Sequence, residues 1–302
     1  MAWLYNQDTD EPMQVKRVLL TLAAASVALG AWLAWKPTSF PTHAAQTNAA
    51  AHRPAPPITA GAHQSTDLTT ASPQRAWFLA LKQRADAGDA VSQRLLAQAY
   101  ARCMGVNYNR ELYAERNRLR IAEATDAEAR SVMETQLSNR MQECDAVEAG
   151  AEVTWEQMRS AYARAARSGD LAARIMDIIH NDREYLDADQ AAELLETVVT
   201  SKDPAAVYAY GSMLGGIISM NMEAPYAPLV EGTRADLAWM VVACRMGYEC
   251  GPDSEPMSDL CQMQDYCYRG SFEHAVRRTL ETDSEREALD RHIEAILRVV
   301  NP

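Results

Sequence analysis

Residues 161–170 read AYARAARSGD, a helix-forming run that ends in Gly169 and Asp170 and is followed at once by a second apolar run, LAARIMDII. Three further turns align with this one: Ala85-x-x-Gly88-Asp89, Ser201-Lys202-Asp203-Pro204 and Cys244-x-x-Gly247. In three of the four turns, a small residue follows within four residues of the Gly position: Ser92, Ala173 and Ala206. Small residues let a second helix pack closely on the first. The pattern therefore predicts a series of helix–turn–helix units.

The composition agrees with this prediction. Hydrophobic residues make up 48% of the 302 residues, but only 7% are aromatic, and Ala, Leu, Val and Met supply most of the apolar surface. This mixture favours helices over strands. Apolar residues recur at helical spacing almost throughout residues 76–302, so we expect one all-α domain there with almost no sheet.

Three fragments resemble Sel-like repeats, the short relatives of tetratricopeptide repeats: Trp239-x-x-x-Ala243-Cys244-x-x-Gly247, Ala161-Tyr162-x-x-Ala165-Ala166-x-x-Gly169-Asp170 and Asp203-x-x-Ala206-x-x-x-Tyr210-Gly211. The resemblance implies a superhelix of antiparallel helix pairs whose concave face binds other proteins or peptides without catalysis. The four turn positions, 88, 169, 202 and 247, lie 81, 33 and 45 residues apart, whereas the family repeats about every 36 residues. We therefore expect a short, irregular array in which one repeat is missing or degenerate.

Residues 110–143 depart from the repeat pattern. The segment contains neither Gly nor Pro, is rich in Arg and Glu, and spaces its apolar residues irregularly. We interpret it as one or two insertion helices. Such a charge density is more typical of a solvated helix face than of a docking site.

The first 75 residues are predicted to export and tether this domain. Residues 18–35 carry no charge, and an 18-residue helix is just long enough to cross a membrane. Lys16 and Arg17 precede the run, so residues 1–17 are expected in the cytoplasm and the remainder in the periplasm. An uncleaved inner-membrane anchor is favoured, and a signal peptide cut after a residue such as Ala44 is the alternative. Residues 36–75 are rich in Ala, Pro and Thr and predict a disordered linker.

Residues 76–302 contain 24 Lys and Arg against 37 Asp and Glu, a net charge of −13. This acidic balance argues against nucleic acid as a partner. The chain carries no zinc-protease, nucleophile-elbow, P-loop or dinucleotide-binding motif. We therefore expect no catalytic residues, no metal ligands and no cofactor, and His43, His52 and His63 are interpreted as linker residues.

All six cysteines, Cys103, Cys144, Cys244, Cys250, Cys261 and Cys267, lie in the part predicted to be exported. An oxidising compartment favours disulfides over the alternative, a four-thiolate zinc site, whose cysteine pairs are usually closer in sequence. Six cysteines permit 15 connectivities. We favour Cys103–Cys144, Cys244–Cys250 and Cys261–Cys267; the main alternative pairs Cys244 with Cys267 and Cys250 with Cys261. The Sel-like resemblance implies the Cys244–Cys250 pair, which would span the Gly247 turn.

The leading hypothesis is a membrane-anchored periplasmic domain that binds a protein or peptide of the bacterial cell envelope. Its candidate contact residues are Tyr208, Tyr210, Met220, Met222, Tyr226 and Trp239, although such methionines and aromatic residues more often fill a core. An envelope hydrolase that acts on peptidoglycan with helix-borne carboxylates is the alternative, and a purely structural stalk is a third possibility. Two buried, neighbouring carboxylates with raised pKa values would favour the enzyme, and a groove lined by exposed aromatic residues would favour the binding protein.

Overall fold

The computed structural model describes residues 72–181, 186–215, 226–232, 234–264 and 266–300. These residues form thirteen α-helices and one short 3₁₀ turn, and no strand occurs among them, which confirms the all-α prediction. The predicted segments 1–17 and 18–35, and the linker up to residue 71, lie outside the described residues. The first helix begins at Pro73, three residues before the predicted start of the domain, because Ser72 caps it and Pro73 occupies its first turn. Within the described residues, no helix has both the length and the apolar character needed to cross a membrane.

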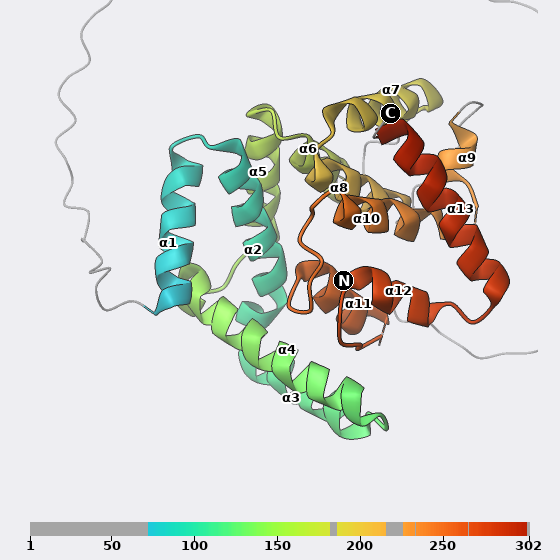
Figure 1. The fold of residues 1–302 in the computed structure, drawn as a ribbon. Coiled ribbons are helices and arrows are strands. Elements are labelled where there is room, and N and C mark those ends of the chain that lie inside the picture. Colours follow the sequence, from blue (N-terminus) through green and yellow to red (C-terminus); the bar gives the residue numbers. More distant parts are fainter. Residues whose placement is uncertain (1–71, 182–185, 216–225, 233, 265, 301–302) are drawn as a thin grey trace, which may run out of the picture. The chain divides into compact units, whose positions relative to one another are not determined.

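Three helix hairpins carry most of the fold (Figure 1). Their helices are α1 (Pro73–Asp86) with α2 (Ala90–Tyr108), α5 (Trp155–Arg167) with α6 (Leu171–His180), and α7 (Ala188–Ser201) with α8 (Pro204–Leu214). The insertion predicted at 110–143 forms two helices, α3 (Arg110–Glu123) and α4 (Ala127–Ala146), followed by the 3₁₀ turn Val147–Gly150. The C-terminal part comprises α9 (Ala227–Val230), α10 (Ala235–Arg245), α11 (Glu255–Gln264), α12 (Phe272–Thr279) and α13 (Asp283–Val300).

Each of the four turn positions found in the sequence adopts a left-handed backbone. Gly88 and Gly169 have φ of +94°, Gly247 has +105°, and Lys202 stands in the corresponding place with +55°. The three glycine turns repeat one hydrogen bond. The N–H of the third residue after the helix donates to a carbonyl of its last turn: Asp89 to Arg84 at 3.1 Å, Asp170 to Ala165 at 3.0 Å and Tyr248 to Ala243 at 2.9 Å. This is the Schellman arrangement, which requires a positive φ and therefore favours glycine. Local chemistry thus fixes where these helices end.

The helices α1, α2, α5, α6, α8, α10 and α13 pack one on the next in this order, although α3 and α4 intervene in sequence between α2 and α5. One cluster of buried residues surrounds Phe78 and Tyr162, and a second surrounds Tyr210 and Trp239. The predicted small residues Ser92, Ala173 and Ala206 are all buried at the helix contacts. The α3–α4 hairpin extends to one side and α4 packs against α1 and α2 (Figure 1).

An ion pair joins the first hairpin to the second inside the protein. Arg94 of α2 donates from Nε to Asp170 Oδ2 at 2.9 Å, and their side chains are only 10% and 3% exposed. Asp170 also caps α6, because its Oδ1 accepts from the Ala173 N–H at 2.7 Å. The Asp170 carboxylate therefore both caps α6 and links the two hairpins.

The closest helix contact lies between α8 and α10, at Gly211. A Cβ placed on Gly211 would lie 2.9 Å from the Asp236 carbonyl oxygen and 3.0 Å from the Met240 nitrogen, both backbone atoms. No side chain fits without separating the two helices. The sequence resemblance placed this glycine at the end of a repeat fragment, and the structure gives its physical reason.

The six cysteines form three disulfides, Cys103–Cys144, Cys244–Cys250 and Cys261–Cys267, which confirms the favoured pairing. The thiols are consequently not available as a four-thiolate zinc site. The first disulfide joins α2 to α4 across 41 residues, a loop long enough for a cross-link to stabilise by about 4 kcal/mol in the chain-entropy model. The second spans the Gly247 turn.

Replacing Asp170 by Asn should separate its two roles. Asn retains the helix cap but leaves the Arg94 guanidinium buried without a counter-charge, so we expect the free energy of unfolding to fall by ~3 kcal/mol. Asp89→Asn is the matched control, because Asp89 caps α2 from the same turn position but is exposed, and it should leave unfolding nearly unchanged. Denaturant titration followed by circular dichroism measures both. Equal effects of the two substitutions would show that the ion pair contributes nothing.

Replacing Gly211 by Ala should lower the free energy of unfolding by about 1 to 3 kcal/mol, because the added methyl group meets backbone atoms that cannot move aside. Gly105→Ala is the control. Gly105 lies within α2, and a Cβ there would meet no atom within 4 Å, so this change should stabilise by about 0.5 to 1 kcal/mol. Thermal unfolding of both variants tests the close contact, and a stable Gly211→Ala protein would contradict it.

Candidate functional site

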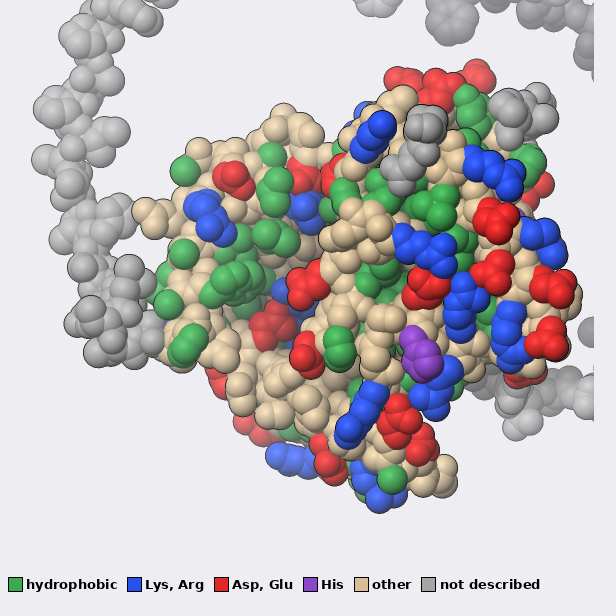
Figure 2. All heavy atoms as spheres, in the orientation of Figure 1, with side chains coloured by type: hydrophobic (Ala, Val, Ile, Leu, Met, Phe, Trp, Pro, Cys, Tyr) green, Lys and Arg blue, Asp and Glu red, His purple; other side chains and the backbone are tan. Residues whose placement is uncertain are grey.

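A groove of about 630 Å³ opens between the first hairpin and the C-terminal helices. We call it the central groove; its lining comes from α1 (Trp77), α2 (Val91, Arg94, Leu95, Gln98, Arg102), α4 (Gln136, Asn139, Arg140, Glu143), the start of α8 (Asp203, Pro204, Ala205), the loop after α10 (Gly247, Tyr248, Glu249, Asp253, Ser254) and α11 (Glu255, Pro256, Ser258). In Figure 2, apolar side chains gather over α1 and α2, beside a hollow where acidic and basic side chains meet. No single repeat supplies this site.

One wall of the central groove is apolar. Trp77 and Val91 line it with 45% and 51% of their surface exposed, and Leu95 lies beside them, half-buried. Trp77 is exposed because α1 buries a different stripe, Phe78, Leu81 and Ala85, against its neighbours. Val91 sits in the first turn of α2, just after the Asp89 cap. Exposed large apolar side chains that share one concavity are a usual mark of a binding surface.

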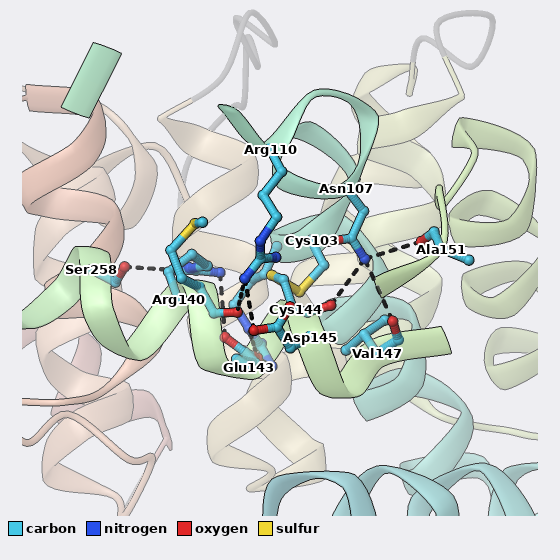
Figure 3. Close-up of a disulfide and its surroundings, with 12 residues drawn as sticks. Cys103, Asn107, Arg110, Arg140, Glu143, Cys144, Asp145, Val147, Ala151 and Ser258 are labelled. Carbon is cyan, nitrogen blue, oxygen red and sulfur yellow. Dashed lines mark hydrogen bonds and ion pairs between the residues drawn. A yellow bond between two sulfur atoms is a disulfide. The ribbon is translucent and has the colours of Figure 1, made fainter. Parts of the chain in front are cut away.

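The floor of the central groove is a network of charged side chains from α2, α4 and α11. Arg102 Nη2 lies 2.7 Å from Glu143 Oε1, and Arg102 Nη1 lies 3.3 Å from Glu255 Oε2. Arg140 donates to the Ser258 hydroxyl at 2.8 Å and lies 3.7 Å from Glu143 (Figure 3). These guanidinium groups are held by internal partners, and the network ties the insertion helix α4 to α11.

The Cys103–Cys144 disulfide fixes two members of this floor. Arg102 and Glu143 immediately precede the two cysteines in the sequence, so the cross-link holds their backbones close together. Asn107, one turn after Cys103, donates to the carbonyl oxygens of Cys144 and Ala151, both at 3.1 Å. The floor is therefore rigid where α2 meets α4.

Two carboxylates lie one turn apart on α11 beneath the groove. Glu255 lines the groove and is paired with Arg102, whereas Asp259 is set deeper and does not line it. Burial, followed by the nearby negative charge of Glu255, raises the pKa of Asp259 to about 7; Arg140 and Arg102 oppose the shift. Burial raises the pKa of Tyr208 well above its usual value, and the nearby negative charge of Asp259 raises it further.

Part of the rim of the central groove is acidic. Asp203, Glu249 and Asp253 line it, and none of the three forms an ion pair within the described residues. Asp203 retains one role inside the protein, because it caps α8 by accepting from the Ala205 N–H at 2.9 Å. The rim therefore presents negative charge that no described cation neutralises.

Two buried polar atoms of the lining lack a hydrogen-bond partner in the part of the chain that the structure describes: Ser254 Oγ and Gln136 Oε1. Ser254 is only 5% exposed. A buried polar group without a partner costs free energy unless a ligand or water satisfies it. Both atoms can accept a hydrogen bond.

The aromatic residues proposed from the sequence do not form one site. Tyr210 and Trp239 are completely buried, with ring centroids 4.9 Å apart, and the Trp239 indole N–H donates to the Leu229 carbonyl at 2.8 Å. Neither offers surface to a partner in this structure, because α8 and α10 bury them in the core. Tyr226 lies elsewhere and donates its hydroxyl to Glu196. Met220 and Met222 lie outside the described residues.

Tyr208 is the one proposed aromatic residue that approaches the central groove. It is half-buried and stacks on Tyr248, with ring centroids 4.5 Å apart and an interplanar angle of 13°, and Tyr248 lines the groove. Sequence reasoning missed Trp77, Val91 and Tyr248. Trp77 could have been found, because it falls outside the stripe of Phe78, Leu81 and Ala85 that helical spacing predicts to be buried.

Comparisons with known proteins found no matching family model, no similar curated protein and no similar solved structure. The chain is therefore interpreted through its own geometry.

The pKa of Asp259 gives a pH-dependent prediction. Between about pH 4 and pH 7 the folded protein retains a proton that the unfolded chain releases, so this carboxyl lowers the free energy of unfolding progressively as the pH rises through that range. Asp259→Asn should remove this loss. We expect the variant to gain stability over the parent at pH 8 and to gain little at pH 4.

Unfolding curves of the parent and of Asp259→Asn across that pH range measure the effect. Asp253→Asn is the control, since Asp253 is exposed in the loop just before the same helix and should give a difference that does not change with pH. A constant difference between Asp259→Asn and the parent would contradict the buried carboxyl.

Proposed function

We propose that residues 72–300 form a protein-interaction domain of the bacterial cell envelope and that the central groove binds a polypeptide segment of its partner. The observation that carries this proposal is the exposed apolar wall of Trp77, Val91 and Leu95 inside a groove of peptide dimensions. Non-enzymatic binding in a concave surface is also what a Sel-like array would do. The left-handed turns at Gly88, Gly169 and Gly247, each followed by a further helix, support that resemblance.

The proposal includes export to the periplasm and tethering through residues 18–35. Three disulfides in the described part support a location outside the reducing cytosol, where such cross-links rarely persist. A tethered binding domain needs no catalytic group. The rigid floor beneath the central groove suits this role, because a preformed surface loses little entropy when it binds.

An envelope hydrolase acting on peptidoglycan is the second candidate, favoured by one observation. Glu255 and Asp259 are neighbouring carboxylates, and the pKa of Asp259 is raised to about 7, a value suited to a general acid. However, Asp259 does not line the groove, and Glu255 is paired with Arg102. This arrangement supports a structural role for the two carboxylates, so binding remains the favoured function.

Site-directed photo-crosslinking of the full chain in intact cells tests the binding proposal. The photoreactive residue p-benzoylphenylalanine in place of Trp77 should give discrete adducts with another polypeptide, because this position is part of the apolar wall. The same residue in place of Trp155 is the matched control, since Trp155 is 41% exposed on α5 and does not line the groove.

Adducts at position 77 that disappear in a Val91→Asp background would support the groove as the site. Equal labelling at both positions, or none at 77, would overturn the proposal. Release of soluble fragments from purified peptidoglycan, abolished by Glu255→Gln, would instead favour the hydrolase.

A further inference from the structure

We infer that the central groove selects a polypeptide segment in which a Lys or Arg side chain lies next to a bulky apolar side chain; this inference rests on the proposed binding function. The apolar wall and the acidic rim belong to the same groove. An occupant that contacts both must therefore carry an apolar group and a cation close together. The net charge of −13 on residues 76–302 would also attract such a segment from a distance.

The sorting of donors and acceptors inside the groove supports a donor-rich occupant. The guanidinium groups of Arg94, Arg102 and Arg140 are engaged by Asp170, Glu143 and Glu255 or by Ser258. Among the described residues, the two buried lining atoms without a hydrogen-bond partner, Ser254 Oγ and Gln136 Oε1, can both accept. Within the same part of the chain, the lining carboxylates without an ion-pair partner are those of Asp203, Glu249 and Asp253.

Ser254 provides an observation independent of the acidic rim. Its hydroxyl is buried, lines the groove and has no hydrogen-bond partner among the described residues. Leaving such a group unsatisfied is costly, and a backbone N–H of a bound segment could satisfy it. An acidic segment would instead meet these carboxylates, and the arginines of the groove are already engaged by other groups. Like charges placed opposite each other across an interface disfavour the wrong partner.

Fluorescence anisotropy with three labelled peptides of equal length tests the inference on the full chain in detergent. The first peptide alternates Lys or Arg with Leu, the second replaces its basic residues by Glu, and the third replaces Leu by Ser. We expect the first peptide to bind at least about tenfold more tightly than either of the others. Its affinity should fall as salt rises, because exposed charges are screened.

The double variant Asp203→Asn, Asp253→Asn should weaken the first peptide roughly fivefold and flatten its salt dependence, since it removes two solvent-screened charge contacts that each contribute little. Asn retains the α8 cap at position 203, so the fold is preserved. Glu287→Gln is the control, because Glu287 lies on α13 with a side chain 73% exposed and outside the groove.

The two proposals fail in different ways. If the acidic peptide binds as tightly as the basic one and Trp77→Ala weakens both, the groove binds peptides but the inferred charge selection is wrong. If the Lys–Ser peptide binds as tightly as the first, the groove attracts cations alone and the apolar requirement is wrong. If no peptide binds and Trp77 gives no crosslinks in cells, the binding function itself fails.

Discussion

The packing of the first two hairpins depends on the carboxylate of Asp170, which both caps a helix and forms a buried ion pair. Asp170 caps α6 at the end of the turn in the second hairpin. It also forms an ion pair with Arg94 of the first hairpin, and both side chains are buried. A charge buried to this extent tolerates no loss of its partner. The geometry of one turn therefore fixes how two hairpins pack. Because Arg94 also lines the central groove, the same pair sets the position of its wall.

The insertion between the first two hairpins supplies part of the central groove. The α3–α4 hairpin is covalently joined to α2 by Cys103–Cys144, and Arg140 and Glu143 of α4 reach Ser258 of α11 and, through Arg102, Glu255. Without α4 the groove would have no floor between α2 and α11. The charges of the insertion are consequently not only a solvated face, as the sequence suggested, because several of them hold distant parts of the chain together.

Local features of the fold could be predicted from sequence, and the site could not. Turns at 88, 169, 202 and 247, the buried small residues and the cysteine pairs depend on neighbouring residues or on spacing, and the structure contains all of them. The central groove joins α1 to α11 across the whole domain. Periodicity predicts that Trp239 lies on a helix, but its complete burial depends on the packing of α8, α9 and α13, which no local pattern records.

The distribution of polar partners explains why this groove would discriminate between occupants. A guanidinium group that is paired to a carboxylate offers little further attraction to an anion, whereas an unpaired rim carboxylate remains open to a cation. Arg102 and Arg140 lie at the floor and are paired; Glu249 and Asp253 lie at the rim and are not, among the residues described. Apolar contact with Trp77 and Val91 would then supply most of the affinity, and the acceptors would set the choice of sequence. Rigidity of the floor sharpens that choice, because a floor held by a disulfide and a charged network cannot rearrange to fit a different occupant.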